Sequence, residues 1–204
     1  AGVGLSVDIT GLEAETEYEV RLADNGSYSE VKTFVTEKPV QLYNMSFDDW
    51  YLDGKIHYPY AKGSEPSVWD SANPGAATFI GSSTTPEEGF VVKGKAARLE
   101  SKYAVIAFAA GNIYTGQFGK IAGVGAELDW GVPFEGRPAA LKGYYSYSPQ
   151  TINYSKAPHE DKMGQTDKCQ ILVCLTDWTT PFRINTTAGE FVDFDNDRAV
   201  WIGD

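Results

Sequence analysis

The chain has 204 residues, of which 42% are hydrophobic and 13% aromatic, and it carries 21 glycines and a net charge of −11. This composition is typical of a glycine- and aromatic-rich β protein, and the acidic balance argues against nucleic acid and anionic membrane surfaces as partners. No apolar run approaches the roughly 20 residues that a transmembrane helix needs.

The first module covers residues 1–38, with strands predicted at 16–22 and 31–36. Leu12 precedes a strand-opening tyrosine, Tyr18, by six residues, an arrangement that resembles the tyrosine corner of sandwich domains. The module therefore resembles the last three strands of an immunoglobulin- or fibronectin III-like domain. Because such a domain has about seven strands, we expect another polypeptide segment to complete its sheet.

A short linker, Glu37-Lys38-Pro39, separates this module from residues 41–204. There, short apolar runs alternate with turns every ~8–12 residues, the pattern of a β-sandwich. Strands are predicted at 42–48, 89–93, 97–109, 122–130, 141–147, 168–177 and 182–186, followed by a hairpin with arms 190–194 and 198–202. No long window has helical periodicity, so we expect helix only as a turn or two, with 85–88 as the candidate.

An aromatic cluster occupies the turn-rich segment at the start of this domain: Trp50, Tyr51, Tyr58, Tyr60 and Trp69. Since loops run over the surface, we expect partly exposed rings, whose flat faces suit the C–H face of a pyranose. Polar residues nearby could hydrogen-bond sugar hydroxyls: Asp48, Asp49, Asp70 and Asn73. The alternative is that the rings form a satellite core at the end of the sandwich.

Two carboxylates, Glu127 and Asp129, share one face of a predicted strand because side chains alternate along it. Retaining glycosidases need two carboxyl groups about 5–5.5 Å apart, so these residues are the catalytic candidates. Jelly-roll endo-β-glucanases use three alternating acids on one strand, however, whereas Trp130 and Gly131 follow here. A solvated strand face is the alternative reading.

A stiff loop at 131–138 contains Pro133 and Pro138, each of which fixes a backbone φ angle. The predicted strand behind it opens with Tyr144 and Tyr145. A rigid loop that delivers aromatic side chains onto a β surface favours a shallow binding face. Both tyrosines are therefore candidate ligand-binding residues.

The two cysteines, Cys169 and Cys174, lie five positions apart in one predicted strand. They should point to opposite faces roughly 16 Å apart, which is too far for a disulfide. We expect two unpaired, buried and unreactive thiols.

Three alternating acids, Asp193, Asp195 and Asp197, are candidate metal ligands, and structural calcium is the one cofactor that they suggest. Arg198 stands where an EF-hand loop requires glycine. A hairpin turn, in which Asp and Asn are favoured, explains the same residues.

Four landmarks resemble the putative carbohydrate metabolism domain family of Gram-negative cell-envelope proteins: Trp69–Asn73 followed by Thr84-Thr85-Pro86, Ala110–Gly116, the 131–138 loop, and Lys142–Tyr145. The resemblance implies a jelly-roll β-sandwich exported to the envelope, often behind immunoglobulin-like modules, with no established reaction or substrate. Family members continue past the equivalent of Asp204, so we expect this chain to be a fragment whose edge at 200–202 is completed by further strands. The alternative is that the three N-terminal strands fold back and cover this edge themselves.

These features together predict an all-β protein: a jelly-roll β-sandwich over 41–204 behind a partial module at 1–38, secreted, periplasmic or attached to the outer cell surface. The predicted role is non-catalytic glycan binding or adhesion at the bacterial cell envelope. The alternatives are a glycoside hydrolase acting through Glu127 and Asp129, and a purely structural surface or fimbrial module.

Overall fold

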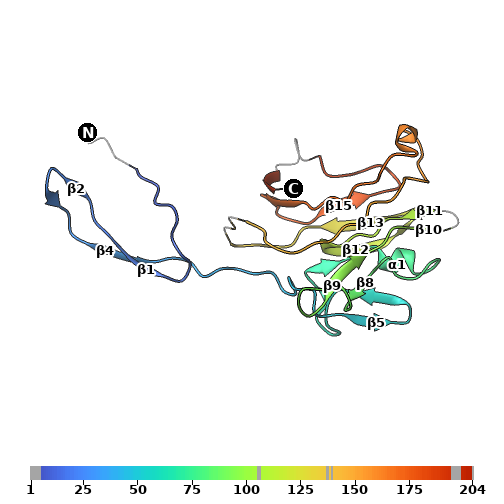
Figure 1. Cartoon of the computed structure of the whole chain (residues 1–204), viewed down its shortest axis with the longest axis horizontal. Coiled ribbons are helices and arrows are strands. Elements are labelled where there is room, and N and C mark those ends of the chain that lie inside the picture. Colours follow the sequence, from blue (N-terminus) through green and yellow to red (C-terminus); the bar gives the residue numbers. More distant parts are fainter. Residues whose placement is uncertain (1–5, 105–106, 137, 139, 194–198, 204) are drawn as a thin grey trace. The chain divides into compact units, whose positions relative to one another are not determined.

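The computed structural model describes residues 6–104, 107–136, 138, 140–193 and 199–203. The chain forms two compact units, one of Ala1–Gln41 with Glu135–Pro138, the other of Leu42–Phe134 with Ala139–Asp204 (Figure 1). Helix is confined, within the described residues, to α1 (Asn73–Ala76) and a 3-10 turn at Glu160–Lys162. The fold is therefore all-β, as predicted, while the jelly-roll topology stays a prediction.

The strands of the first unit are β1 (Glu17–Val20), β2 (Ala23–Asp24), β3 (Ser27–Tyr28) and β4 (Lys32–Val35). β1 pairs antiparallel with β4, and β2 with β3. The β2–β3 turn is Asn25-Gly26, and both residues have positive φ, at 44° and 85°, as a tight hairpin turn requires.

Tyr18 anchors the first unit through both its ring and its hydroxyl group. The hydroxyl accepts a hydrogen bond from the Glu13 backbone N–H at 2.8 Å, which is the bond expected of a tyrosine corner. The ring stacks on Phe34 of the neighbouring strand, with centroids 5.9 Å apart. The predicted strands at 16–22 and 31–36 correspond to β1 and β4.

The strands of the second unit are β5 (Tyr51–Asp53), β6 (Ile56–Tyr58), β7 (Trp69–Asp70), β8 (Thr84–Glu87), β9 (Ala96–Leu99), β10 (Lys102–Ala104), β11 (Ala107–Ala109), β12 (Tyr114–Ala122), β13 (Gly125–Trp130), β14 (Val173–Thr176), β15 (Phe182–Asn185) and β16 (Ala199–Gly203). The largest sheet has the order β15-β13-β12-β7 and is antiparallel throughout. β5–β6, β8–β9, β10–β11 and β14–β16 are two-stranded pairs.

The core of this unit lies on one face of the four-stranded sheet. Tyr114, Leu128 and Ile184 are buried there, one each from β12, β13 and β15. Leu128 and Ile184 are direct partners across the ladder. Because side chains alternate along a strand, Glu127 and Asp129 on either side of Leu128 take the opposite face.

Several predicted strands are wrong. Residues 42–48 form no strand and contain a turn at 43–46, 89–93 form no strand, and 141–147 run as exposed chain outside any ladder. The helical turn predicted at 85–88 overlaps strand β8 instead. The α-helical turn lies at Asn73–Ala76, and Pro74 stands at one of the first two positions of this helix. Proline is favoured there because the first N–H groups of a helix have no partner inside it.

The longest strand, β12, and the β5–β6 hairpin were not predicted. β12 contains Gly116 and Gly119, which weaken a strand pattern. Gly116 has φ of +135°, and a Cβ atom there would overlap the Asp129 carbonyl oxygen. The glycine is thus needed for β12 to approach β13, although it lowers the strand signal in the sequence.

Candidate functional site

Three tyrosines form a compact cluster on the β5–β6 hairpin. Tyr51 and Tyr58 are partners across the ladder and stack with centroids 4.6 Å apart and planes inclined by 11°. Tyr60 meets both rings at 5.4 and 5.5 Å and is buried. Burial is the main reason that the pKa of each of the three tyrosines is raised. Tyr58 and Tyr51 keep partly exposed rings, whereas Tyr60 packs as core.

The two tryptophans of the same segment, Trp50 and Trp69, are half-buried around Phe47. The indole N–H of Trp50 donates to the Phe47 carbonyl at 2.7 Å. The indole N–H of Trp69 donates to the Tyr43 carbonyl at 2.8 Å, and its ring meets Phe47 edge-on at 5.0 Å. Both polar edges are therefore bonded to the protein's own backbone.

Asn73 is fully buried and its amide is completely used inside the protein. Its NH₂ group donates to the carbonyls of His57 and Thr84 at 2.7 and 2.6 Å. Its oxygen accepts from the backbone N–H groups of Ser83 and Thr84, both at 2.9 Å. This side chain links α1 to strands β6 and β8.

Asp70 is also buried, and its carboxylate accepts the N–H groups of Ser71 at 2.7 Å and Phe118 at 2.8 Å. Burial raises its pKa, and these two hydrogen bonds oppose the rise. Asp70 and Asn73 thus hold together β7, β12 and the residues around α1. The structure gives both predicted sugar-binding side chains internal partners.

Tyr144 and Tyr145 are strongly exposed, with 86% and 77% of their surface accessible. Since 141–150 form no strand, the predicted sheet surface beneath them is absent. Their rings are accessible, but the backbone hydrogen bonds of a ladder do not fix their positions.

Glu127 and Asp129 lie on one face of β13, as predicted, and both contact Arg183 of β15. Nη1 of Arg183 donates to Glu127 at 2.8 Å, Nη2 donates to Asp129 at 2.8 Å, and Nε contacts the second oxygen of Asp129. Lys120 approaches Glu127 at 3.3 Å from the other side. The two carboxylates are parts of an ion-pair network, which raises the pKa of Arg183.

The remaining sequence candidates are Asp193, Asp195 and Asp197. Asp193 is exposed, and Asp195 and Asp197 lie outside the described residues. In the part of the chain that the structure describes, no group of three or more His, Cys, Asp or Glu side chains could hold a metal ion.

The cysteines differ from the prediction in one respect. Both thiols are unpaired, but Cys169 is exposed and only Cys174 is half-buried. The strand predicted over 168–177 begins at Val173, so Cys169 lies before it. Burial raises the pKa of the Cys174 thiol.

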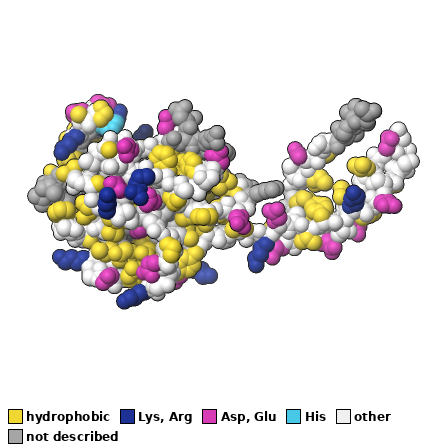
Figure 2. Space-filling model, turned by 180° about the vertical axis from the view of Figure 1, so that it is seen from behind, with side chains coloured by type: hydrophobic (Ala, Val, Ile, Leu, Met, Phe, Trp, Pro, Cys, Tyr) yellow, Lys and Arg dark blue, Asp and Glu magenta, His cyan; other side chains and the backbone are white. Residues whose placement is uncertain are grey.

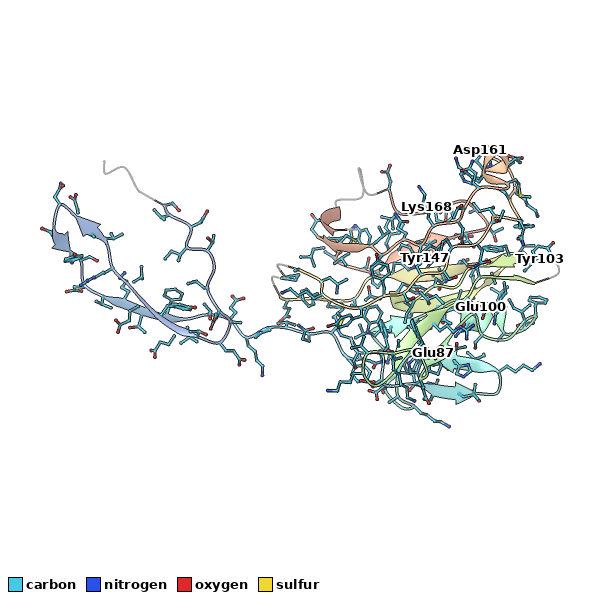
Figure 3. All side chains as sticks on the ribbon, in the orientation of Figure 1. Glu87, Glu100, Tyr103, Tyr147, Asp161 and Lys168 are labelled. Carbon is cyan, nitrogen blue, oxygen red and sulfur yellow. The ribbon has the colours of Figure 1, made fainter. Side chains whose placement is uncertain are left out.

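An aromatic surface that the sequence did not reveal lies on the β10–β11 hairpin. Tyr103 and Phe108 are partners across this hairpin, and 54% and 47% of their surface is exposed. Tyr154 packs against both, with centroids 4.9 and 5.8 Å away, and Lys156 lies 5.7 Å from the Tyr154 ring centre. Figure 3 shows Tyr103 at the edge of the second unit. Only the fold brings Tyr154 to these residues.

A shallow depression of about 430 Å³ is a second feature that the sequence did not reveal. Its lining residues are Asp177, Trp178, Thr179, Thr180, Pro181, Phe182 and Arg183. The Trp178 and Phe182 rings are 5.1 Å apart. Arg183 connects the depression to the carboxylates of Glu127 and Asp129. Apolar side chains also reach the surface elsewhere on both units (Figure 2).

A family model described as "Putative carbohydrate metabolism domain" matches residues 46–203. No curated protein and no solved structure matches the chain. The match spans well over half of the sequence and includes nearly all of the second unit. No helix among the described residues is long and apolar enough to cross a membrane.

Proposed function

The chain belongs to the putative carbohydrate metabolism domain family, and we propose that it binds glycans at the bacterial cell envelope without cleaving them. The observation that carries this proposal is the exposed surface of Tyr103, Phe108 and Tyr154. The family resemblance suggests that the protein is secreted or attached to the cell envelope. The proposed partner is a glycan of the cell surface.

Aromatic rings recognise sugars through flat apolar faces that pack against the C–H groups of a pyranose, while the polar ring edge stays wet. Tyr103 and Phe108 offer about half of their surface to solvent. Tyr154 lies against both rings and orders them before a ligand arrives, which reduces the entropy lost on binding. The nearby ammonium group of Lys156 supplies a hydrogen-bond donor for hydroxyl groups.

Some of the residues predicted from the sequence belong to the proposal as a second contact region. Their rings are partly or fully exposed: Trp50, Tyr58, Trp69, Tyr144 and Tyr145. Asp70, Asn73 and Tyr60 are buried, so we assign them to the support of this region.

The ion-pair network supports binding over hydrolysis. A glycosidase needs one carboxyl group that donates a proton and a second that attacks or activates water. Here the guanidinium of Arg183 contacts both oxygens of Asp129 and one oxygen of Glu127, and Lys120 contacts the other oxygen of Glu127. The oxygens of both carboxyl groups are therefore engaged with cations of the protein itself.

The first unit favours a further, structural role as a docking module. Within the described residues, β1 and β4 pair only with each other, and apolar side chains such as Leu22 and Val35 are 76% and 64% exposed. Unpaired strand edges are templates for strand addition. We propose that a strand of another polypeptide adds to this sheet.

The test of glycan binding is an array of bacterial and plant polysaccharides probed with the whole chain. We expect binding that the double variant Tyr103→Ala/Phe108→Ala loses, while Phe90→Ala keeps it, because Phe90 is 77% exposed outside this surface. Release of reducing sugar is measured in parallel, with Glu127→Gln as the control. Hydrolysis that Glu127→Gln abolishes would replace the binding function with the hydrolase.

A further inference from the structure

The depression at residues 177–183 is built around one aromatic residue with a fixed position. Trp178 packs beside Phe182, and Gly131 lies next to it, where an added Cβ atom would make an ordinary van der Waals contact of 3.7 Å with the six-membered ring of the indole. The same tryptophan lines the depression. An aromatic side chain held in place by its neighbours loses little conformational entropy when a ligand stacks on it.

Polar groups surround this ring in a pattern that suits hydroxyl groups. Thr179 and Thr180 each carry a hydroxyl that can donate and accept, Asp177 carries acceptors, and Arg183 carries donors. Three of the five N–H groups of Arg183 are used by the carboxylates of Glu127 and Asp129. These bonds fix the plane of the guanidinium and leave its other two N–H groups for a ligand.

The size and composition of the depression match a site for one or two sugar rings. A volume of about 430 Å³ lies within the roughly 300–1,000 Å³ that is usual for small-ligand pockets, which combine apolar walls with a few placed polar groups. We propose that this depression is a pyranose-binding subsite in which Trp178 stacks on the sugar. The inference rests on the proposed glycan binding and adds a place and a ligand class to it.

The local charge selects among sugars. Glu127 and Asp129 both contact the guanidinium of Arg183, and Lys120 lies 3.3 Å from Glu127. The positive charge of Arg183 is thus already paired, and a ligand carboxylate would have to compete for it with the carboxylates of Glu127 and Asp129. Like charges across an interface are unfavourable, so the subsite is for neutral pyranoses and disfavours uronic acids.

The test uses affinity electrophoresis of the whole chain in gels that contain a neutral glucan, mannan or xylan, or polygalacturonate. We expect a neutral polysaccharide to retard the protein, Trp178→Ala to weaken that affinity about tenfold or more, and Trp178→Phe to weaken it less because a ring remains. Phe90→Ala, which removes an exposed ring elsewhere, should match wild type. Polygalacturonate should bind at least about tenfold more weakly than the best neutral polymer.

Circular dichroism of each variant separates lost binding from lost folding. If Trp178→Ala does not fold, acrylamide quenching of tryptophan fluorescence is measured instead. We expect the neutral polysaccharide to protect the fluorescence of wild type from quenching and to protect that of Trp178→Phe less. Wild-type affinity in folded Trp178→Ala, together with loss in Tyr103→Ala/Phe108→Ala, would overturn the subsite and leave glycan binding standing. A wild-type chain that binds none of the polymers would overturn both. A preference for polygalacturonate would overturn the neutral assignment.

Discussion

Arg183 lies directly opposite Asp129 across the β13–β15 ladder, and its guanidinium contacts both oxygens of that carboxylate. One register position away, Leu128 and Ile184 face each other in the core. The strand alternation thus places a charged network on one face of the sheet and a hydrophobic core on the other. The same two strands that bury the core orient the polar wall of the 177–183 depression.

The first prediction concerns the geometry of this network. Replacing Arg183 with Lys keeps the charge but loses the fork that contacts two carboxylates at once. We expect the melting temperature to fall by a few degrees. Arg98→Lys is the matched control, since its contacts with Glu87 and Glu100 are 3.9 and 3.5 Å long at a similar exposure. Thermal unfolding followed by circular dichroism measures both, and equal melting temperatures would show that the fork adds nothing to stability.

The second prediction assigns Asn73 a structural role. Asn73→Asp is nearly the same size, but it removes the two donors to the His57 and Thr84 carbonyls and buries a carboxylate. We expect a loss of about 3 kcal/mol or more in the free energy of unfolding, because buried polar groups lose their partners. Urea denaturation measures it, with Asn153→Asp, the same change at an exposed asparagine, as the control. A folded variant of unchanged stability that had lost glycan binding would instead make Asn73 a ligand contact.

The third prediction uses the raised pKa of Asp70. A carboxyl group whose pKa is higher in the folded than in the unfolded state favours folding when protonated, and this contribution disappears as the pH rises through the folded-state pKa. The window therefore begins near the ordinary value of 3.8 and extends upward. Asp70→Asn removes the titration, so the stability of wild type relative to this variant should fall from pH 4 to pH 7.

Urea denaturation of both proteins across that pH range gives this difference directly. The comparison is needed because other carboxyl groups shift the other way: the pKa values of Asp48, Glu87 and Asp161 are lowered by hydrogen bonds. A constant difference between the two proteins would mean that the pKa of Asp70 is not raised by folding.

Local signals in the sequence located about half of the strands. Asn25-Gly26 is a typical hairpin dipeptide, and the alternation of Glu127, Leu128 and Asp129 located β13 and its two faces. Those features depend on neighbours in sequence, so they can be read from it. The aromatic segment was also identified, although the sequence could not show that Tyr60 is buried.

The rest depended on contacts between distant residues. Gly116 is needed in β12 because the backbone of β13 approaches it closely. The alternation of side chains along a strand does not reveal such a requirement. Tyr154 meets Tyr103 and Phe108 only through the fold. Arg183 lies 54 residues from Asp129 in the sequence. The spacing of residues therefore could not reveal this ion pair, which argues against catalysis. Asp70 and Asn73 looked like ligand residues because polar side chains in turns are usually exposed.

The fourth prediction separates the two thiols. Cys169 is exposed, whereas Cys174 is half-buried and burial raises its pKa. Since the thiolate is the reactive form, Cys169 should react with a thiol reagent much faster in the native protein. Titration with Ellman's reagent should give one fast and one slow thiol, and Cys169→Ser should remove the fast phase. Two fast thiols would contradict the burial of Cys174.

The last prediction concerns the first unit, whose strands leave much apolar surface in water. Val7, Leu22 and Val35 are 80%, 76% and 64% exposed, and β1 and β4 have no other strand partner within the described residues. Unpaired edges beside apolar side chains favour association with another strand. Without an added partner, we expect the purified chain to self-associate in a concentration-dependent way, and light scattering coupled to size exclusion measures its mass. Val35→Lys should reduce this association, because Val35 lies in β4 and a charge on a strand edge opposes pairing. Val124→Lys, at a 72% exposed valine of the second unit, should not. A mass of 22.3 kDa at every concentration for all three proteins would show that this surface does not bind a second copy.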